Sequence, residues 1–314
     1  MHRALRTSLA GRQPGKPLPR PRPRPQIAAP WSLRRVDGLQ ILELAPFKRL
    51  PWLVHGFSTR TGGCSILPSG ERALNLSYTE WDSRETVTQN RKAFQRALGA
   101  EKLNLVALRQ FHSAVVHPFA AVPSEPRKGD ASLTNAAGLL LAVQTADCVP
   151  ILLVHPKKRA VAAIHAGWRG TLARIAEKTV GEMRMKFGSK PSDILAAVGP
   201  AIGACCYEVG TELVTEFTSQ FPDAEGYFDE LRTGEEPNPL QWLNMMPPGH
   251  QPPPKNVRLD LRKANRSQLL AAGLRDAHIF VSDLCTACHT DLFFSYRKEA
   301  AGSGRLLAVG GVIE

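Results

Sequence analysis

The chain has 314 residues, of which 43% are hydrophobic and 22% are charged, and its formal net charge is +12. This composition is ordinary for a soluble globular protein, and because no run of 18 apolar residues occurs we expect no transmembrane helix. The length suits one large domain or two ordinary ones.

The positive charge is concentrated near the N-terminus. Residues 1–36 contain nine Lys or Arg residues and no acidic residue, whereas the remainder carries 31 basic and 28 acidic residues. That near-neutral remainder also lacks a stripe of basic and aromatic residues on which bases could stack. We therefore expect no specific nucleic-acid partner.

Residues 1–30 are predicted to form a disordered basic tail. Their second part, RQPGKPLPRPRPRPQIAAP, is rich in Pro and Arg and has little apolar surface to bury. The segment lacks the apolar core of a secretory signal, so we expect a cytoplasmic protein with a dispensable tail. Import into an organelle is the alternative, because the first twelve residues contain Arg and no acidic residue.

From residue 31 onward, strands and helices alternate irregularly. In chain order, apolar patterns and capping signals predict a strand at 38–47, a strand that runs into a Gly-Gly turn at 52–65, a helix at 83–100, a strand at 105–117, and two apolar runs within 131–155 that break at Asp147 and Cys148. The patterns then predict a strand that ends in a Gly-bracketed turn at 159–170, a helix at 171–188, and a short strand that leads into a turn at 194–203. Further along they predict helices at 208–221 and from about Leu261 to 273, and strands at 278–283, 292–296 and 305–313. The short link at 156–158 is typical of a hairpin rather than of a crossover.

These elements predict an α/β (α+β) fold, with mixed β-sheets flanked by helices in a single domain from residue 31 to 314. Residues 222–256 are polar and Pro-rich, so we interpret them as a surface insertion. The glycines form neither a dinucleotide-binding fingerprint nor a phosphate-binding Walker loop.

Three residues at predicted strand ends are candidates for chemistry: His112, Cys148 and His165. Two imidazoles and a thiolate would leave a fourth position open, as in catalytic zinc sites. A rival interpretation makes Cys148 a nucleophile and His165 its base. Asp147 is then the obvious orienting carboxylate, although neighbouring residues on a strand point to opposite faces. An inert buried thiol and two interior imidazoles remain the plain alternative.

The other cysteines give weaker patterns. The sequence has six, and without a secretory signal a disulfide framework is not expected. The segment CTACH, from Cys285 to His289, matches a haem-attachment pattern, but haem attachment normally requires export. A four-cysteine zinc site needs a second close pair, and Cys205 and Cys206 are adjacent, which is poor spacing. We therefore assign neither a haem nor a zinc ion to this segment.

Three arginines lie at turns beside apolar strands: Arg60, Arg169 and Arg297. A guanidinium in such a place can hold a phosphate or a carboxylate in a two-pronged contact. A surface charge is the plain alternative for each of them.

Several motifs occur in order along the chain, namely FSTRTGG, LNLS, QFH, TADCVPILL, AAIHAGWRGT, VGPAIGACCYEVG, DLCT and FFSYRKEAAGSGR. Over about residues 40–313 they resemble the family of multicopper polyphenol oxidase or laccase-domain proteins, which is described as purine nucleoside phosphorylases with adenosine deaminase activity. Some bacterial relatives are described as peptidoglycan editing factors.

The resemblance implies that His112, Cys148 and His165 bind a catalytic zinc ion. It also places Arg60, Asn75 and Arg297 on motif positions around the pocket. The chain departs from the pattern at two positions. Ser113 replaces a usual glycine, which could alter the loop beside the metal, and Lys298 replaces a usual arginine, which could weaken anion binding.

The implied reaction is phosphorolysis of adenosine, inosine, guanosine or 5'-methylthioadenosine to the base and ribose 1-phosphate, together with deamination of adenosine. The partners are then purine nucleosides and phosphate, and the chain is expected to be a monomer or a small homo-oligomer. Two alternatives remain: a copper polyphenol oxidase, and a cysteine hydrolase that edits peptidoglycan precursors.

Overall fold

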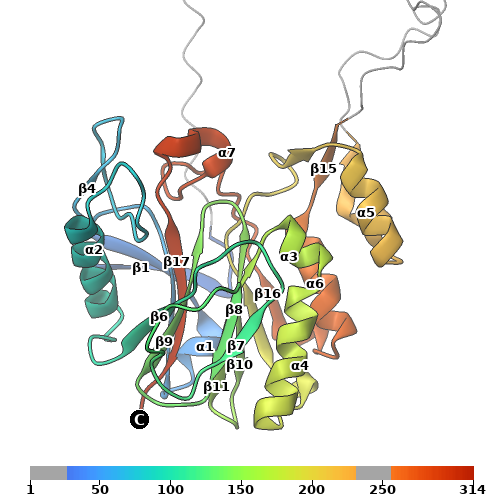
Figure 1. Cartoon of the computed structure of the whole chain (residues 1–314), viewed down its shortest axis with the longest axis horizontal. Helices are drawn as coiled ribbons and strands as arrows, with labels where there is room; N and C mark the ends of the chain where they lie inside the picture. The colour runs from blue at the N-terminus through green and yellow to red at the C-terminus, as the bar shows by residue number, and fades with distance from the viewer. Residues whose placement is uncertain (1–26, 231–255) are drawn as a thin grey trace, which may run out of the picture.

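The computed structural model describes residues 27–230 and 256–314. Most of the predicted tail and most of the predicted insertion therefore lie outside the described residues. Two six-stranded mixed sheets pack face to face, and helices cover their outer faces (Figure 1). This arrangement confirms the predicted α+β class in one domain.

The first sheet has the order β1-β2-β3-β17-β9-β6. Its strands are β1 (Trp31–Val36), β2 (Leu39–Leu44), β3 (Leu53–Ser58), β17 (Leu306–Val312), β9 (Leu139–Thr145) and β6 (Asn104–Ala107). Neighbouring strands are antiparallel except β6 and β9, which are parallel. Helix α2 (Arg84–Ala97) covers the outer face, where Phe94 shares an apolar cluster with Leu140 and Val309.

The second sheet has the order β16-β12-β10-β11-β8-β7. Its strands are β16 (Ile279–Val281), β12 (Leu195–Val198), β10 (Val149–His155), β11 (Ala160–Ala166), β8 (Ala131–Thr134) and β7 (Val116–Pro118). Helix α4 (Ile175–Phe187) packs on β11, β8 and β7, and helix α6 (Leu261–Ala271) packs on α4 and β16. Both helices cover the outer face of this sheet (Figure 1).

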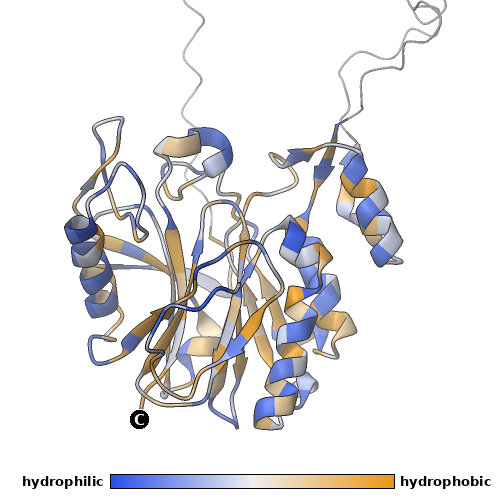
Figure 2. Ribbon diagram, in the orientation of Figure 1, coloured by the Kyte–Doolittle hydropathy of each residue, from blue (hydrophilic) through white to orange (hydrophobic). Residues whose placement is uncertain are grey.

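The main core lies between the two sheets. Strand β11 contacts β9 and β17, and the apolar cluster there joins Leu141 and Val143 of β9 to Leu152 and Ala163 of the second sheet. All seven residues of β10 and of β11 are buried, because one face meets this core and the other meets the helices. Figure 2 shows the central strands as largely hydrophobic and α2 as largely hydrophilic.

Smaller elements surround the ends of the sheets. The helices are α1 (Ala45–Lys48), α3 (Trp168–Leu172), α5 (Glu212–Gln220) and α7 (Tyr296–Glu299). The short helical turns are Pro191–Asp193, Ala224–Tyr227, Asp276–His278 and Ala300–Gly302. The minor sheets contain β4 (Ser65–Ile66) with β5 (Arg72–Ala73), and β13 (Glu208–Val209) with β15 (Val257–Leu259) and β14 (Phe228–Glu230). No helix of the described residues has the length and apolar character needed to cross a membrane.

The structure differs from the sequence predictions in several segments. Residues 45–47 belong to α1 and not to a strand, and residues 208–209 form β13 and not a helix. The predicted strand at 292–296 is wrong, since these residues form a loop that leads into α7. The predicted helix at 171–188 is interrupted at Arg174, whose φ of 61° ends α3 and precedes α4. The predicted strand at 105–117 is two strands, β6 and β7, separated by a loop that carries His112. The predicted insertion begins with an ordered turn and with β14, which pairs with β15.

Candidate metal centre and cavity

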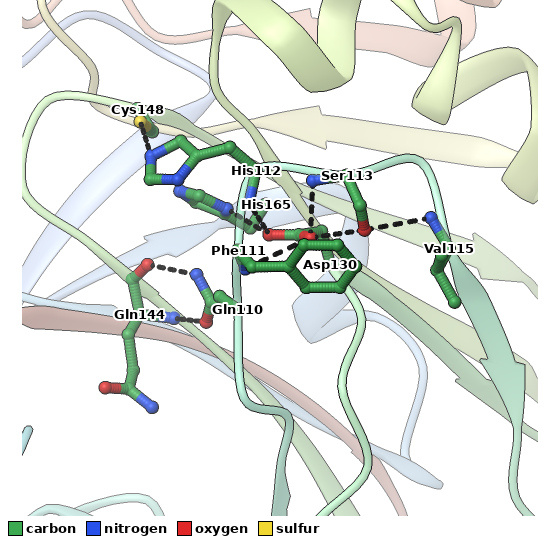
Figure 3. A network of polar contacts seen from close by, with 9 residues as sticks. All are labelled: Gln110, Phe111, His112, Ser113, Val115, Asp130, Gln144, Cys148 and His165. Atoms are coloured by element: carbon green, nitrogen blue, oxygen red, sulfur yellow. Dashed lines mark hydrogen bonds and ion pairs between the residues drawn. The ribbon is translucent and has the colours of Figure 1, made fainter.

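Cys148 and His165 meet at one end of the hairpin β10–β11. The two strands are antiparallel with Pro150 opposite His165, so Cys148, which directly precedes β10, lies beside the end of β11. His112 enters from the loop between β6 and β7. One ligand atom from each of the three side chains lies within 4.8 Å of the other two, and Cys148 Sγ is 3.8 Å from His112 Nε2 (Figure 3).

This geometry fits a metal ion. A tetrahedral ion with nitrogen bonds of about 2.0 Å and sulfur bonds of about 2.3 Å would separate its ligand atoms by about 3.4–3.6 Å, close to what is found. The backbone at Gly167 makes this approach possible, because a Cβ there would lie 2.8 Å from His112 Cδ2 and 3.0 Å from Cys148 Sγ. The His112–Cys148–His165 group can therefore hold a metal.

Asp130 organises two of the three ligands, and sequence reasoning missed it. Its fully buried carboxylate accepts a hydrogen bond from His165 Nδ1 at 2.8 Å, which leaves Nε2 of that ring for a metal. The same carboxylate accepts the backbone N–H of His112 at 3.1 Å and of Ser113 at 2.7 Å (Figure 3). These contacts hold His112 at a φ of 63°, a left-handed conformation that is uncommon for a side-chain-bearing residue.

The three buried groups shift one another's protonation. Burial alone would raise the pKa of Cys148, but the charge of His165 and hydrogen bonds from both imidazoles outweigh it and lower that pKa to about 6. Burial alone would lower the pKa of His165, but the charge of Cys148 and the hydrogen bond to Asp130 raise it to about 9. For Asp130, hydrogen bonds from His165 and Ser113 outweigh burial and lower the pKa to about 2. Without a metal, the site at neutral pH is a thiolate–imidazolium pair.

Metal affinity should rise with pH. Because the pKa of His165 is raised, its ring keeps a proton through neutral pH, and that proton must leave before Nε2 binds a metal. Displacing one proton predicts an affinity that increases about tenfold per pH unit between about pH 7 and about pH 9. Competition with a chelating dye at several pH values measures this slope. An affinity that does not change over that range would contradict the assignment of His165 as a ligand.

Asp130→Asn should weaken metal binding by about 10–100-fold, the usual cost of removing a partner that orients a ligating histidine. The amide cannot replace both carboxylate oxygens that accept from His165 and from the 111–113 backbone. A zinc titration of the purified variant measures the loss. Asp291→Asn is the matched control, since Asp291 is exposed and distant from the three ligands in sequence. Equal affinities in the two variants would show that Asp130 does not support the ligands.

Asp147 does not orient His165. It lies in the bend between β9 and β10, so its side chain is placed by that bend and not by the alternation of strand side chains. Its carboxylate accepts hydrogen bonds from Thr286 Oγ1 and from the backbone N–H of Arg297, both at 2.7 Å. Asp147 has a φ of 90° and precedes Cys148 directly. It therefore anchors two distant segments beside the metal ligands.

A cavity of about 710 Å³ opens beside the three ligands. Its lining is polar and aromatic in character and includes His112, Cys148 and His165, four aromatic residues, four arginines and two glutamines: Tyr78, Trp168, Tyr207, Tyr296, Arg109, Arg169, Arg297, Arg305, Gln110 and Gln144. A volume of this size is typical of small-molecule sites.

Of the predicted anion-binding residues, Arg169 and Arg297 line this cavity. The Arg169 guanidinium lies 4.3 Å above the Trp168 ring, and within the described part of the chain it makes no hydrogen bond or ion pair. Arg297 stacks on Tyr207 at 5.0 Å and donates to the Glu208 carbonyl. The N–H donors of Arg169 are thus available to a ligand, whereas one N–H donor of Arg297 is already bonded to the Glu208 carbonyl.

Arg60 and Asn75 lie behind the wall instead of among the lining residues. Arg60 is buried and donates to the Thr290 carbonyl at 2.7 Å and to Glu299 Oε1 at 2.6 Å. Asn75 is fully buried, and its side-chain oxygen accepts the backbone N–H of Arg305 at 3.0 Å. Both residues position segments that carry lining residues.

Sequence reasoning also missed Arg305, Tyr207 and Tyr296. Each lies inside a motif quoted above, but nothing in the local pattern distinguishes its side chain from its neighbours'. Arg305 lies over the Tyr296 ring at 5.5 Å, a contact between residues that only the folded chain brings together.

Known proteins resemble this chain in sequence and in fold. Residues 54–312 match the family described as multi-copper polyphenol oxidoreductase laccase. Purine nucleoside phosphorylase YlmD of Geobacillus stearothermophilus is 38% identical over 271 residues, which cover 82% of this chain and 89% of that protein. Adenosine deaminase RL5, from an unknown prokaryotic organism, is 34% identical and covers 84% of this chain and 96% of its own.

A solved structure shares the architecture. The crystal structure of the Bacillus licheniformis hypothetical protein YfiH superposes with a TM-score of 0.75 at 29% identity, covering 91% of this chain and 100% of that one. This chain therefore has its overall fold in common with that protein.

Proposed function

The chain belongs to the family described as multi-copper polyphenol oxidoreductase laccase, and we propose that it is a zinc-dependent purine nucleoside phosphorylase with adenosine deaminase activity. Its relatives are named as enzymes that act on purine nucleosides, so the chain is an enzyme. The substrates we propose are adenosine, inosine, guanosine and 5'-methylthioadenosine, with phosphate as the second reactant.

The observation that carries the proposal is the composition of the cavity wall. One cavity of about 710 Å³ is lined by the three potential metal ligands, by aromatic rings and by the guanidinium of Arg169, whose N–H donors are not bonded to the described protein. A purine is a flat aromatic base that stacks on such rings, and phosphate is the anion that guanidinium groups bind best. A nucleoside with a phosphate fits this combination of surfaces.

Zinc is the metal we propose for the three ligands. Two imidazoles and one thiolate form a borderline-soft set that suits zinc, and three protein ligands are the number found in catalytic zinc sites. Zinc, when bound, supplies a Lewis acid that activates water near neutral pH. Asp130 keeps the His165 ring in the orientation and the tautomer that this role requires.

The remaining cavity residues bind and orient. Tyr78 and Tyr296 are each about half exposed and line the cavity, so part of each side chain is accessible to a substrate. Burial and the nearby charge of Cys148 raise the pKa of Tyr207 to about 12, so its hydroxyl stays a hydrogen-bond donor at neutral pH. Arg169 offers its guanidinium to phosphate. Holding phosphate beside the sugar lowers the entropic part of the activation barrier, because the two reactants are already positioned.

Incubating the purified chain with adenosine, with and without phosphate, tests the proposal. Adenine that forms only when phosphate is present shows phosphorolysis, and inosine that forms without phosphate shows deamination. Chelation followed by zinc restoration should remove and then restore both products. Neither product from the zinc-loaded protein would overturn the proposal.

A cysteine hydrolase acting on peptidoglycan precursors is the second candidate, and one observation favours it. The Cys148 thiolate, the His165 imidazolium and the Asp130 carboxylate form a chain of charged partners like that of an activated nucleophile. Trapping of an acyl group on Cys148 would support this candidate. Alkylation of Cys148 that proceeds only after zinc is chelated would instead support the metal site.

A copper polyphenol oxidase agrees with the family description, but the donor set does not favour it. The sequence has nine histidines and no His-x-His pair, and in residues 27–230 and 256–314 two histidines belong to a potential metal group. A multicopper centre requires several more imidazoles. Several copper ions per purified chain would reverse this ranking.

We further propose that the catalytic unit is residues 31–314, that the protein is cytoplasmic, and that it is a monomer or a small homo-oligomer. The Ala45 N–H donates to the Pro30 carbonyl at 2.9 Å, so a truncation should keep residues from 27 onward. A chain lacking residues 1–26 is expected to keep its activity within about twofold, because the cavity-lining residues of the described part of the chain lie between Ser77 and Arg305. Activity assays of the truncated chain test this, and complete loss would mean that the tail takes part in function.

A further inference from the structure

Four cysteines meet at a second place in the molecule. Cys205, Cys206, Cys285 and Cys288 each offer a sulfur, and these atoms lie within 4.8 Å of one another. Cys288 Sγ is 3.5 Å from Cys205 Sγ and 3.4 Å from Cys206 Sγ. The sequence prediction that the adjacent pair is unsuitable for a shared site is therefore corrected.

Backbone geometry explains the correction. Side chains of adjacent residues diverge to opposite faces only in a strand. Cys205 and Cys206 instead lie in a hydrogen-bonded turn, in which the N–H groups of Cys206 and Tyr207 both donate to the Gly203 carbonyl at 2.9 Å. In a helical turn adjacent side chains are only about 100° apart, so both sulfurs can face the same point.

The opposite pair comes from a matching turn. The N–H groups of Cys288 and His289 donate to the Cys285 carbonyl at 3.2 and 3.1 Å. An isolated bridge between Ala201 and Cys285 joins this turn to the first one. The two turns thus present two sulfurs each to one centre.

We propose that these four cysteines bind a structural zinc ion. A tetrahedral zinc with sulfur bonds of about 2.3 Å separates its sulfurs by about 3.8 Å, and the sulfur separations of 3.4 Å, 3.5 Å and at most 4.8 Å bracket that value. A disulfide would require about 2.05 Å. Cys285 to Cys288 has the C-x-x-C spacing usual for such ligands.

The surroundings suit a thiolate cluster. The Gly203 N–H donates to Cys285 Sγ at 3.2 Å, a contact that stabilises charge on sulfur. A Cβ on Gly203 would lie 2.8 Å from an Arg262 guanidinium nitrogen and 3.2 Å from Cys205 Sγ, so cation and sulfur border the same small space. Arg262 is held there by donating to the Ser282 carbonyl at 2.9 Å. Its positive charge would offset part of the negative charge of four thiolates.

The cluster joins the two loops that form one wall of the cavity. Ile202 and Tyr207 flank the first turn and line the cavity, and Arg297 follows the second turn. Thr286, between the two cysteines of that turn, donates to Asp147 beside the metal ligand Cys148. The inferred role of this zinc is therefore to clamp both loops and to fix the wall of the reaction cavity, at a site separate from the His112–Cys148–His165 group.

Zinc counting on the full chain tests the inference. The protein is purified under reducing conditions, equilibrated with zinc and dialysed, and its metal is then measured by mass spectrometry. About two zinc ions per chain are expected, one for each group. Cys205→Ser, at the exposed cysteine of the cluster, should lower the count by about one and should lower Tm, whereas Cys64→Ser, outside both groups, should change neither.

Cobalt substitution gives a second readout that does not depend on activity. Cobalt bound by four thiolates has intense visible absorption of tetrahedral sulfur coordination, and Cys205→Ser should lose it while Cys148→Ala keeps it. Two results would overturn the inference: a zinc count that is the same in Cys205→Ser and in the wild-type chain, or a disulfide between the two turns in the reduced, zinc-loaded protein. Cys148→Ala removes a ligand of the other group and leaves the four cysteines intact, so its zinc count reports on the four-cysteine site alone. The test therefore distinguishes an incorrect four-cysteine zinc site from an incorrect proposed function, on which this inference does not rest.

Discussion

Replacing Cys148 by alanine is expected to remove the metal from the His112–Cys148–His165 group and to lower both phosphorolysis and deamination by at least about 10³-fold. Metal ions acting as Lewis acids supply several kcal/mol of transition-state stabilisation, and about 1.4 kcal/mol corresponds to a factor of ten. The loss also removes one of the two anionic partners of His165 and leaves Asp130 as the other, so the pKa of His165 should fall. Zinc content and the rates of both reactions measure the effect.

His112→Ala separates the metal site from the cysteine nucleophile. A metal site loses its ion when any one of three ligands is removed, so His112→Ala should be about as inactive as Cys148→Ala. A hydrolase that uses Cys148, His165 and Asp130 keeps all three groups in the His112 variant. Cys64→Ala is the matched control and should keep zinc and activity. Substantial turnover by zinc-free His112→Ala would refute the metal mechanism.

Replacing Arg169 by alanine is expected to separate the two reactions. Phosphorolysis should lose about 10–100-fold in kcat/KM for phosphate, because a hydrogen bond to a charged group contributes about 1.5–3 kcal/mol. Deamination uses no phosphate, so its rate should stay within about threefold. The guanidinium of Arg169 lines the cavity and makes no hydrogen bond or ion pair with the described residues, so its donors are available to phosphate.

Steady-state kinetics with phosphate as the varied substrate measure this split, and adenosine deamination is followed in phosphate-free buffer. Arg184→Ala is the matched control, since Arg184 is an exposed arginine of α4 outside the cavity lining. An equal loss of both reactions in Arg169→Ala would mean that the residue supports the fold of the site. An unchanged phosphate dependence would assign the anion to another lining arginine.

Much of the fold could be predicted because the apolar patterns are long and regular. The hairpin β10–β11 is an example. Its two continuous apolar runs are separated only by Pro-Lys-Lys, a link that is too short for the crossover between parallel strands. Residues 292–294 are likewise apolar, yet they lie in the loop before α7. Phe293 and Phe294 are fully buried there by tertiary contacts, which periodicity cannot distinguish from burial in a strand.

The candidate site likewise contains some residues that the sequence points to and others that only the folded chain reveals. The sequence alone selected His112, Cys148 and His165 as candidates, because imidazole and thiol groups at predicted strand ends are chemically distinctive and because the surrounding motifs resemble those of a known family. Only the tertiary structure decided that Asp130, not Asp147, supports them, since a carboxylate's role depends on which distant donors surround it. The four-cysteine cluster shows the same limit. Spacing predicted against it, because whether two adjacent sulfurs diverge or converge depends on backbone dihedral angles that the residue order does not reveal.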